Sequence, residues 1–568
     1  MKDVNQINAD ILILGSGGAG FMAALHAYDV NPELNIVLAV KGLAGKSGCT
    51  RMVQGGYNVV LDPKDSHEKH FLDTIKGGGF INNQELAWTL VTDAPKIVLE
   101  LENKVGCFFD RGPDGMLHQK SFAGQSFDRT IHRRDLTGIE IIARLRDQIF
   151  AKDIQVLEEC RGIDLLTKDN RVVGALLLDI RSGEPIVVNC RAVILCTGGG
   201  ATMYKIAAPS MEKSGDGVAM VFRAGAEFID MEMMQFHPTG LLAGESRLSG
   251  SVLEEGLRGA GGRLYNALGE RFMERYDSER MERSTRDQVA RASYMEIMEG
   301  RGTQNGGVLL DMSHLGAEFV ERTFPGMVDR VKDIGKDLAR EPIEVSPTAH
   351  FHMGGVRIDR DCRCNLEGLF VAGEDAGGVH GANRLGGNGV AESTVFGARA
   401  GDASAKYVSE CDNVTIDYEQ MYYIWQETTK PFQLAKGEDA YGLRNELKLL
   451  TWEKMGVVRS KELLEQSLSE LNEMDERAKQ IKVSGARRYN MEWNEALNIL
   501  NLITVGKMIA KSALMREESR GSHYRSDFPE IDNKNWLKNI CLIRDEKGDM
   551  RLYTRPVILS RIKPDDIT

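Results

Sequence analysis

The sequence lacks the features that mark several large classes of protein. None of its nine cysteines forms a C-x-x-C pair, so it encodes neither an iron–sulfur cluster nor a structural zinc site. No apolar run approaches the ~20 residues that a membrane span requires. The chain also has no excess of basic residues, because its formal net charge is −12. This charge argues against nucleic acid or an anionic membrane as a partner.

Targeting signals are also missing from the start of the chain. Residues 1–10, MKDVNQINAD, are polar and contain neither an apolar signal segment nor twin arginines. We therefore predict a cytoplasmic protein with no transmembrane segment of its own. A protein held at the periphery of a membrane by a partner would have the same composition. Its cysteines are expected to be reduced.

Glycine, by contrast, is abundant, and its 60 residues gather in short runs rather than repeats. Residues 10–40 read as an apolar strand, the turn GSGGAG, an apolar helix and a second strand. In this β-α-β setting Gly15 permits the tight turn, Gly17 lets a pyrophosphate approach the helix N-terminus, and Gly20 lets helix and strand pack closely. The predicted dinucleotide-binding turn comprises Gly15, Gly17, Gly18, Ala19 and Gly20.

Two further glycine clusters indicate which dinucleotide is bound. AVILCTGGGATMY (192–204) and GLFVAGEDAGGVHGANRLGGNGVAES (368–393) each contain a strand next to glycines. The second strand of the first unit ends in Lys41, not in the acidic residue that usually binds the adenosine ribose of NAD. Three such elements suit a long FAD molecule held along one domain, whereas a single NAD would need only the first. The predicted cofactor is therefore FAD.

Six motifs in a fixed order carry a specific resemblance. They are QFHPTG (235–240), EEGLRGAGG (254–262), TRDQVARA (285–292), PTAHFHMGG (347–355), HGANRLGGN (380–388) and ESRGSHYRSDFPE (518–530). Together they resemble the flavoprotein subunits of succinate dehydrogenase and fumarate reductase, a family that includes L-aspartate oxidase. The resemblance extends over nearly the whole chain.

The resemblance implies an α/β fold built around a Rossmann-like FAD-binding domain. That domain is expected in two segments, 1–236 and 351–410, with an α+β capping domain (237–350) inserted between them. A C-terminal helical region and tail (411–568) is expected to follow. The apolar residues of ELKLLTWEKMGVVRSKELLEQSLSELNEM recur at helical spacing, which suits a core or a docking face for a partner subunit.

The resemblance also assigns substrate-binding residues. Reducing a C=C bond between carboxylates requires a hydride donor, a proton donor and groups that polarise the carboxylate. Arg384 matches the arginine that binds the substrate carboxylate, a task for which the planar guanidinium is suited. His237 and His350 match the two substrate-binding histidines.

A third arginine is assigned to proton donation. Arg286 matches the proton donor of the family, although an arginine has a pKa above ~12 and must regain its proton quickly. Glu255 and Arg258 match the residues that return it. Because they are three positions apart, they are expected on one face of a helix. The resemblance further implies contacts with FAD from Lys41, Cys49, Thr50, Gly55, Gly56, Thr197, Gly198, Gly199, Asp216, Glu374 and Gly389.

Cys49, in KSGCTRMVQGG, departs from the pattern of the membrane-bound members. In those proteins a histidine before the threonine is bonded to the 8α carbon of the flavin, and alignment on Thr50 puts Cys49 in its place. L-aspartate oxidase has serine there and binds FAD without a bond. We therefore expect non-covalent FAD, with a thioether as the alternative. Loss of the bond lowers the flavin potential, which favours reduction of the alkene.

Glu254 is a second departure, because the family usually has threonine before the relay glutamate and uses its hydroxyl to bind the far carboxylate of the substrate. An ionised glutamate about 4–5 Å from a carboxylate costs ~3–4 kcal/mol at an effective dielectric of ~20. Either Glu254 is turned away, protonated or ion-paired, or the substrate presents a donor or cation there. We favour the second option, an unsaturated acid with an amide, amine or longer acyl group at its far end.

Three functions remain open at this point. The first is a fumarate-reductase-like flavoprotein that receives electrons from an iron–sulfur or other redox partner, since the chain has no cluster ligands. The second is an L-aspartate-oxidase-like enzyme, which would turn over aspartate and release peroxide. The third is a non-catalytic FAD-binding electron-transfer protein, which the four residues His237, Arg286, His350 and Arg384 argue against.

Overall fold

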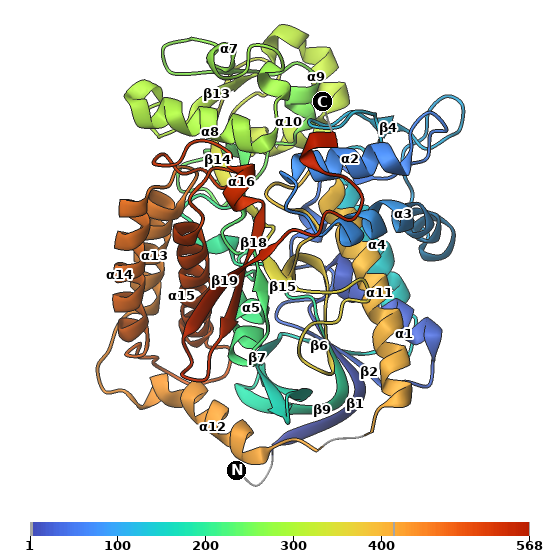
Figure 1. Ribbon diagram of the computed structural model, residues 1–568, viewed down its shortest axis with the longest axis vertical. Helices are drawn as coiled ribbons and strands as arrows, with labels where there is room; N and C mark the ends of the chain where they lie inside the picture. The colour runs from blue at the N-terminus through green and yellow to red at the C-terminus, as the bar shows by residue number, and fades with distance from the viewer. Residues whose placement is uncertain (1–3, 413–414, 567–568) are drawn as a thin grey trace.

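The computed structural model describes residues 4–412 and 415–566, which form three neighbouring regions (Figure 1). A sheet and its helices occupy the lower right of the view. The segment coloured green and lime forms a separate layer at the top. Long orange and brown helices stand side by side at the left.

The predicted β-α-β unit forms the centre of a seven-stranded sheet. The strand order is β6-β2-β1-β9-β8-β7, and β16 also pairs with β9. The pairs of β1 with β2 and β9, of β2 with β6, and of β9 with β16 are parallel, whereas β7 and β8 form antiparallel pairs. The carboxyl ends of β1, β9 and β16 therefore meet at one edge, where ligands bind in sheets of this type. The strands are β1 (Asn5–Leu14), β2 (Ile36–Val40), β6 (Gln155–Glu158), β7 (Cys160–Lys168), β8 (Arg171–Asp179), β9 (Glu184–Leu195) and β16 (Leu369–Val371).

Two glycines allow a long helix to pack closely on the first helix of this unit. A Cβ atom on Gly397 would lie 2.4 Å from the carbonyl oxygen of Ala19, and one on Gly401 would lie 2.4 Å from that of Ala23. Figure 1 shows the two helices side by side at the right of the sheet. The helices of this region are α1 (Gly18–Val30), α2 (His67–Gly77), α3 (Gln84–Glu100), α4 (Thr137–Phe150), α5 (Asp216–Arg223) and α11 (Asn388–Glu410), and its small sheet contains β3 (Tyr57–Asn58), β5 (Thr130–Ile131) and β4 (Gln119–Lys120).

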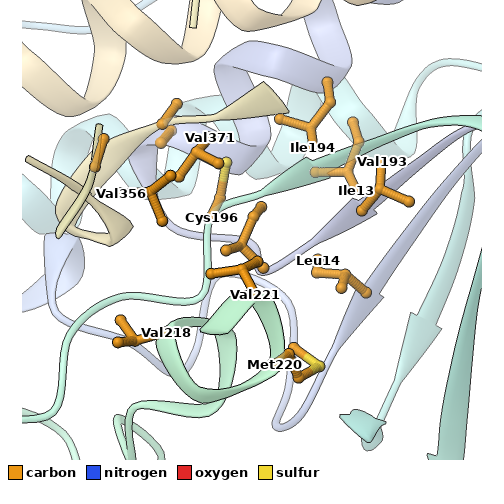
Figure 2. Packing of buried hydrophobic residues seen from close by; sticks show 14 of the residues in the cluster. Ile13, Leu14, Val193, Ile194, Cys196, Val218, Met220, Val221, Val356 and Val371 are labelled. Carbon is orange, nitrogen blue, oxygen red and sulfur yellow. The ribbon is translucent and has the colours of Figure 1, made fainter. Parts of the chain in front are cut away.

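Apolar side chains fix the edge of the sheet at which these elements converge. In Figure 2, Leu14 from β1 and Ile194 from β9 lie on the sheet, and Val221 of α5 packs below them beside Cys196. All four side chains are buried. Each fully buried aliphatic side chain contributes about 1.5–3 kcal/mol, so the positions of the adjoining loops are strongly determined.

The layer at the top of Figure 1 has a hydrophobic cluster of its own, made of residues between Leu241 and Val345. Its four-stranded antiparallel sheet has the order β11-β14-β13-β12. Met234 of β11 and Ala349 of β14 belong to the hydrophobic cluster of the large sheet, whereas Leu241 and Val345 of the same strands belong to this one, so both strands connect the two layers. The elements are β11 (Met234–Leu241), α6 (Gly256–Gly259), β12 (Arg263–Tyr265), α7 (Met273–Tyr276), α8 (Arg286–Glu296), β13 (Val308–Asp311), α9 (Ala317–Thr323), α10 (Pro325–Lys332) and β14 (Ile343–His352).

The C-terminal region begins with four helices: α12 (Tyr418–Thr429), α13 (Ala440–Met455), α14 (Lys461–Ala478) and α15 (Met491–Met515). Helix α15 is long and apolar enough to cross a membrane, since the mean hydropathy of its most apolar 18-residue stretch is 1.2. Polar residues interrupt this stretch, so the sequence contains no continuous apolar run there. However, 67% of that stretch is buried inside the protein. Helix α15 is thus the core helix of this region.

After α15 the chain returns to the region of the large sheet, where it forms two strands. β18 (Lys538–Arg544) pairs with β10 (Phe228–Ile229) and with β19 (Met550–Pro556), and the sheet order is β17-β15-β10-β18-β19. The other two strands are β15 (Gly355–Arg357) and β17 (Ala376–Gly377). The sequence led us to expect a helical region and tail, and this pairing shows that the tail is partly a strand structure.

Candidate active site

A single cavity of about 690 Å³ extends from the carboxyl edge of the large sheet to the capping layer. Of the residues predicted for the site, Gly20, Gly199 and Arg258 do not line this cavity. The predicted residues that do line it are Gly15, Gly17, Gly18, Ala19, Lys41, Cys49, Thr50, Gly55, Gly56, Thr197, Gly198, Asp216, His237, Glu254, Glu255, Arg286, His350, Glu374, Arg384 and Gly389.

The glycine turn forms one end of the cavity. Gly15 has a φ of +103°, and a Cβ atom there would lie 2.2 Å from the carbonyl oxygen of Cys196, so no other residue fits. A Cβ atom on Gly20 would lie 1.9 Å from the Gly15 carbonyl oxygen, which explains why Gly20 acts in packing and not in lining. Helix α1 begins at this turn, and its first residues line the cavity, so the positive end of the helix dipole faces the cavity. No acidic residue in the first turn neutralises it.

Thr50 and Cys49 lie opposite this helix end. The Thr50 Oγ1 atom accepts a hydrogen bond of 3.0 Å from the backbone N–H of Gly18. Cys49 is half-buried and lines the cavity. Burial raises the pKa of the Cys49 thiol, and the ammonium group of Lys213 opposes this only in part.

Lys41 and Asp216 form a charged cluster in the wall of the cavity. The Lys41 Nζ donates to Asp216 Oδ2 at 2.9 Å and to Asn498 Oδ1 at 2.7 Å, while Arg161 Nη2 donates to Asp216 Oδ1 at 2.7 Å. Burial lowers the pKa of Lys41 to about 8. The two cations together keep the pKa of Asp216 well below its usual range despite the opposing effect of burial.

Glu374 is positioned by contacts on two sides. It forms an ion pair with Lys213, and its Oε1 accepts a hydrogen bond of 2.9 Å from the backbone N–H of His352. A Cβ atom on Gly199 would lie 2.6 Å from the same oxygen, so Gly199 leaves room for Glu374 without lining the cavity. The His352 side chain bonds to the carbonyl oxygen of Met231 at 2.8 Å and has a structural role.

At the capping end, Arg286 and Glu255 form a buried ion pair. Glu255 Oε2 accepts hydrogen bonds from Arg286 Nε at 2.8 Å and from Nη2 at 2.6 Å. Glu255 Oε1 lies 3.7 Å from Arg258 Nη2, so the carboxylate stands between the two guanidinium groups. Although burial opposes it, their combined charge lowers the pKa of Glu255. Arg258 is buried behind Glu255, where its Nη1 donates to the carbonyl oxygen of Glu282 at 2.6 Å.

Gln235 connects Arg286 to the second arginine of the cavity. Its Oε1 accepts from Arg286 Nη1 at 3.1 Å and from Arg384 Nη2 at 3.2 Å. The Arg384 guanidinium also lies 4.5 Å from the centroid of the Phe351 ring. Burial, with a contribution from Arg286, lowers the pKa of Arg384 to about 9, so Arg384 still carries its charge at neutral pH.

Two neutral histidines complete this end of the cavity. The rings of His237, on β11, and His350, on β14, have centroids 5.5 Å apart. The backbone N–H of Thr239 lies 3.3 Å from His237 Nδ1, which makes this nitrogen an acceptor and leaves Nε2 as the donor. Burial lowers the pKa of each histidine well below its usual value, and the neighbouring arginines lower it further.

Glu254 lies beside these groups and is ion-paired. Its Oε1 is 3.3 Å from the Nζ of Lys120, a residue that does not line the cavity, whereas Oε2 is buried without a partner in the described chain. Burial raises the pKa of Glu254, and Lys120 opposes the rise. Of the arrangements considered from the sequence, the structure therefore shows the ion pair. A carboxylate oxygen remains free to accept from a ligand.

The cavity fits FAD in shape and in chemistry. It contains the helix end and glycine turn that a pyrophosphate requires, and it continues for the length of the site to the two arginines. Several buried polar atoms of its lining residues have no hydrogen-bond partner within residues 4–412 and 415–566, among them Arg384 Nε and both carboxyl oxygens of Glu392. Buried polar groups are nearly always satisfied, so these atoms indicate a polar ligand.

Sequence reasoning missed several residues of the site. Gln235 stands two positions before His237 on one strand, and alternation along a strand would have placed both on the same face. Lys120 carried no signal, because 134 positions separate it from Glu254. The partners of Asp216 and Glu374 were missed for the same reason. Local patterns do not reveal contacts that the tertiary fold creates.

Comparison with known proteins finds matches over nearly the whole chain. Residues 10–390 match the family described as FAD binding domain, and residues 444–567 match the fumarate reductase flavoprotein C-terminal family. One chain of the fumarate reductase (CoM/CoB) from Methanothermobacter marburgensis is 44% identical over 94% of this chain and 97% of its own length. The flavoprotein subunit of 8-methylmenaquinol:fumarate reductase from Wolinella succinogenes is 34% identical over 98% of this chain and 92% of its own.

A solved structure shows the same fold over the whole length. A mutant of E. coli quinol fumarate reductase superposes with a TM-score of 0.94 at 32% identity, covering 99% of this chain and 98% of the other. The strands that carry the predicted site therefore belong to an arrangement already seen in an experimental structure.

Proposed function

The chain belongs to the flavoprotein family of succinate dehydrogenase and fumarate reductase, and we propose that it reduces the C=C bond of a fumarate-like unsaturated carboxylic acid. It is an FAD-dependent oxidoreductase that acts on CH–CH bonds. The observation that carries the proposal is the bridge in which Gln235 holds Arg286 and Arg384 at one end of the cavity. Two fixed guanidinium groups favour a carboxylate beside the reacting carbons.

Each residue at this end has a proposed part in the reaction. FAD supplies the hydride for one carbon of the double bond. Arg384 binds and polarises the adjacent carboxylate, and neutral His237 and His350 donate hydrogen bonds to the substrate. Arg286 delivers a proton to the other carbon, and the contact of 2.6 Å with Glu255 supports rapid return of that proton. Arg258, behind Glu255, extends this route.

We propose that the remaining predicted residues hold FAD without a covalent bond. Gly15, Gly17, Gly18, Ala19 and Thr50 suit its pyrophosphate, and Lys41 with Asp216 suits its adenosine end. The raised pKa of Cys49 supports the absence of a thioether, because the thiolate is the nucleophile. The other proposed contacts are Gly55, Gly56, Thr197, Gly198, Glu374 and Gly389, with Gly20 and Gly199 supporting the packing around them.

We also propose that a separate redox protein supplies the electrons, as an iron–sulfur protein or another carrier. Residues 4–412 and 415–566 contain no group of three or more His, Cys, Asp or Glu side chains arranged to hold a metal. A cytoplasmic protein, peripheral to a membrane through that partner, accords with the sequence. The proposed domains are 1–236 with 351–410 for FAD, 237–350 for the cap and 411–568 for the C-terminal region.

Anaerobic reoxidation tests this function. The FAD-loaded protein is reduced with dithionite, the excess is removed, and fumarate is added while the flavin absorbance is followed. We expect reoxidation with formation of one succinate per flavin. A panel of unsaturated acids with an amide, amine or acyl group at the far end then defines the substrate.

Two other outcomes would overturn the proposal. Reduction of the oxidised flavin by L-aspartate, with peroxide release in air, would identify an L-aspartate-oxidase-like enzyme. A flavin that cycles with a redox dye but reacts with no acid of the panel would identify a non-catalytic electron carrier.

A further inference from the structure

A buried carboxyl group lies in the cofactor cavity without a role in the chemistry described above. Glu392, on α11, is 2% exposed and lines the cavity. Neither of its carboxyl oxygens has a hydrogen-bond partner within the described residues. We infer that Glu392 takes up a proton when the bound FAD is reduced, so that it sets the pH dependence of the flavin potential.

The position of Glu392 carries the first step. A carboxyl group buried in protein is nearly always hydrogen-bonded, and an ionised one without partners costs several kcal/mol. Glu392 lines the cavity, and besides the backbone N–H of Gly373 a ligand bound there is the group that can satisfy its oxygens. Glu392 therefore lies close to the bound cofactor, so a negative charge on the cofactor raises the pKa of Glu392.

The surrounding charges carry the second step. Burial raises the pKa of Glu392 to about 8, and Glu374 adds to this, whereas Arg384 opposes it. Asp375 also raises it, and the Cys196 and Cys362 thiols interact with the same carboxyl. Glu374 is already paired with Lys213, and Arg384 is bound by Gln235. Glu392 is thus the carboxyl of this group that lacks a side-chain partner, and the backbone N–H of Gly373 only partly opposes the rise in its pKa.

The third step is the balance of charge on reduction. When FAD accepts two electrons and one proton it gains one negative charge, and a nearby negative charge raises the pKa of a carboxyl group. Above pH 8 the Glu392 carboxylate then binds one proton from solvent and becomes a carboxylic acid. Two electrons from the external donor and two protons from solvent therefore enter the site, one proton on the cofactor and one on Glu392.

The test is a redox titration of the FAD-loaded protein between pH 6.5 and 10 without substrate. For a two-electron couple, each proton taken up lowers the midpoint potential by about 30 mV per pH unit. Above about pH 8 the wild type should take up one additional proton per two electrons. Its midpoint potential should then fall by about 60 mV per pH unit, compared with about 30 mV per pH unit below pH 8. Glu392→Gln should keep the shallower slope throughout, and Glu392→Asp should retain the steeper segment.

Two controls keep the inference falsifiable. Glu410→Gln, at the exposed end of the same helix, should behave as the wild type. If Glu392→Gln fails to bind FAD, the number of protons that the wild type takes up on reduction at pH 9 tests the inference. We expect two protons per two electrons. Equal slopes in wild type and Glu392→Gln, or uptake of one proton, would overturn the inference and leave Glu392 as a plain hydrogen-bond donor. Because no substrate is present, these results are independent of the proposed reaction.

Discussion

The chemistry of one side chain, Cys49, decides how the cofactor is held. Cys49 lines the cavity, but burial raises the pKa of its thiol, so little thiolate is available to attack a flavin. We predict that acid precipitation releases all flavin into the supernatant and leaves a polypeptide of unmodified mass. Cys49→Ser should bind the same amount of FAD. Flavin that stays on a peptide containing Cys49 would contradict this prediction.

Arg286 has a role that mutation can separate from cofactor binding. Arg286→Gln removes both hydrogen bonds to Glu255 and the proposed proton donor. Since general acid catalysis contributes about 10²–10⁴-fold, alkene reduction should fall by that factor while dithionite still reduces the flavin at the normal rate. Arg291→Gln, on the same helix but outside the cavity, is the matched control. A change in KM alone would show that Arg286 only binds substrate.

Glu254 stands where the resemblance to the family led us to expect threonine. Its ion pair with Lys120 reduces the repulsion expected for a far carboxylate, but its Oε2 remains unpaired. We predict that Glu254→Thr lowers KM for fumarate at least about tenfold, or ~1.4 kcal/mol, and raises KM for an analogue with a far-end amide. Lys120→Met should weaken fumarate binding.

The pH dependence of fumarate binding provides the control for this prediction. Since burial raises the pKa of Glu254, falling pH neutralises it before the carboxylates at the surface. KM for fumarate should therefore decrease as pH falls in the wild type but not in Glu254→Thr. Efficient fumarate reduction by the wild type, unimproved by threonine, would refute a role for Glu254 in substrate choice.

Among elements, those with local patterns could be predicted and those joined by distant contacts could not. The strand, glycine turn and helix of β1 and α1 follow from residues 10–40 alone. The burial of α15 and the pairing of β18 with β10 depend on segments hundreds of residues apart. The same division holds in the site, where motif residues were found and the Lys120 partner of Glu254 was not.

The segment between α15 and β18 is held by buried ion pairs. Arg516 is fully buried and pairs with Glu232 at 2.6 Å and with Glu518 at 3.0 Å. Arg516→Met should destabilise the protein by about 3–5 kcal/mol, because it leaves two buried carboxylates without this cation. Calorimetry should show a lowered Tm. Arg477→Ala, which removes exposed pairs, should change stability by less than about 1 kcal/mol. Equal effects of the two variants would contradict the structural role.

For the whole molecule, buried histidines are expected to set the response to acid. Burial lowers the pKa of seven of the 11 histidines, and two of these, His70 and His132, have values of about 4. The other five are His237, His350, His352, His380 and His523. In the unfolded chain each has a pKa of about 6.5 and binds a proton as the pH falls through that value. The unfolded state then binds more protons than the folded state, so the stability of the fold is lost on acidification.

One histidine acts in the opposite direction and supplies the control. Hydrogen bonds to Glu100 and Asp402 overcome the effect of burial and raise the pKa of His26 to about 9, so its contribution is complete below pH 6.5 and disappears as the pH rises towards 9. We predict that Tm of the FAD-loaded protein falls as the pH is lowered from 7.5 to 5.5. The free energy of unfolding should decrease by up to about 1.4 kcal/mol per pH unit for each fully buried histidine. His26→Gln should lower Tm at neutral pH yet keep this acid slope. A Tm that is constant or rises towards pH 5.5 would show that the buried histidines do not control acid stability.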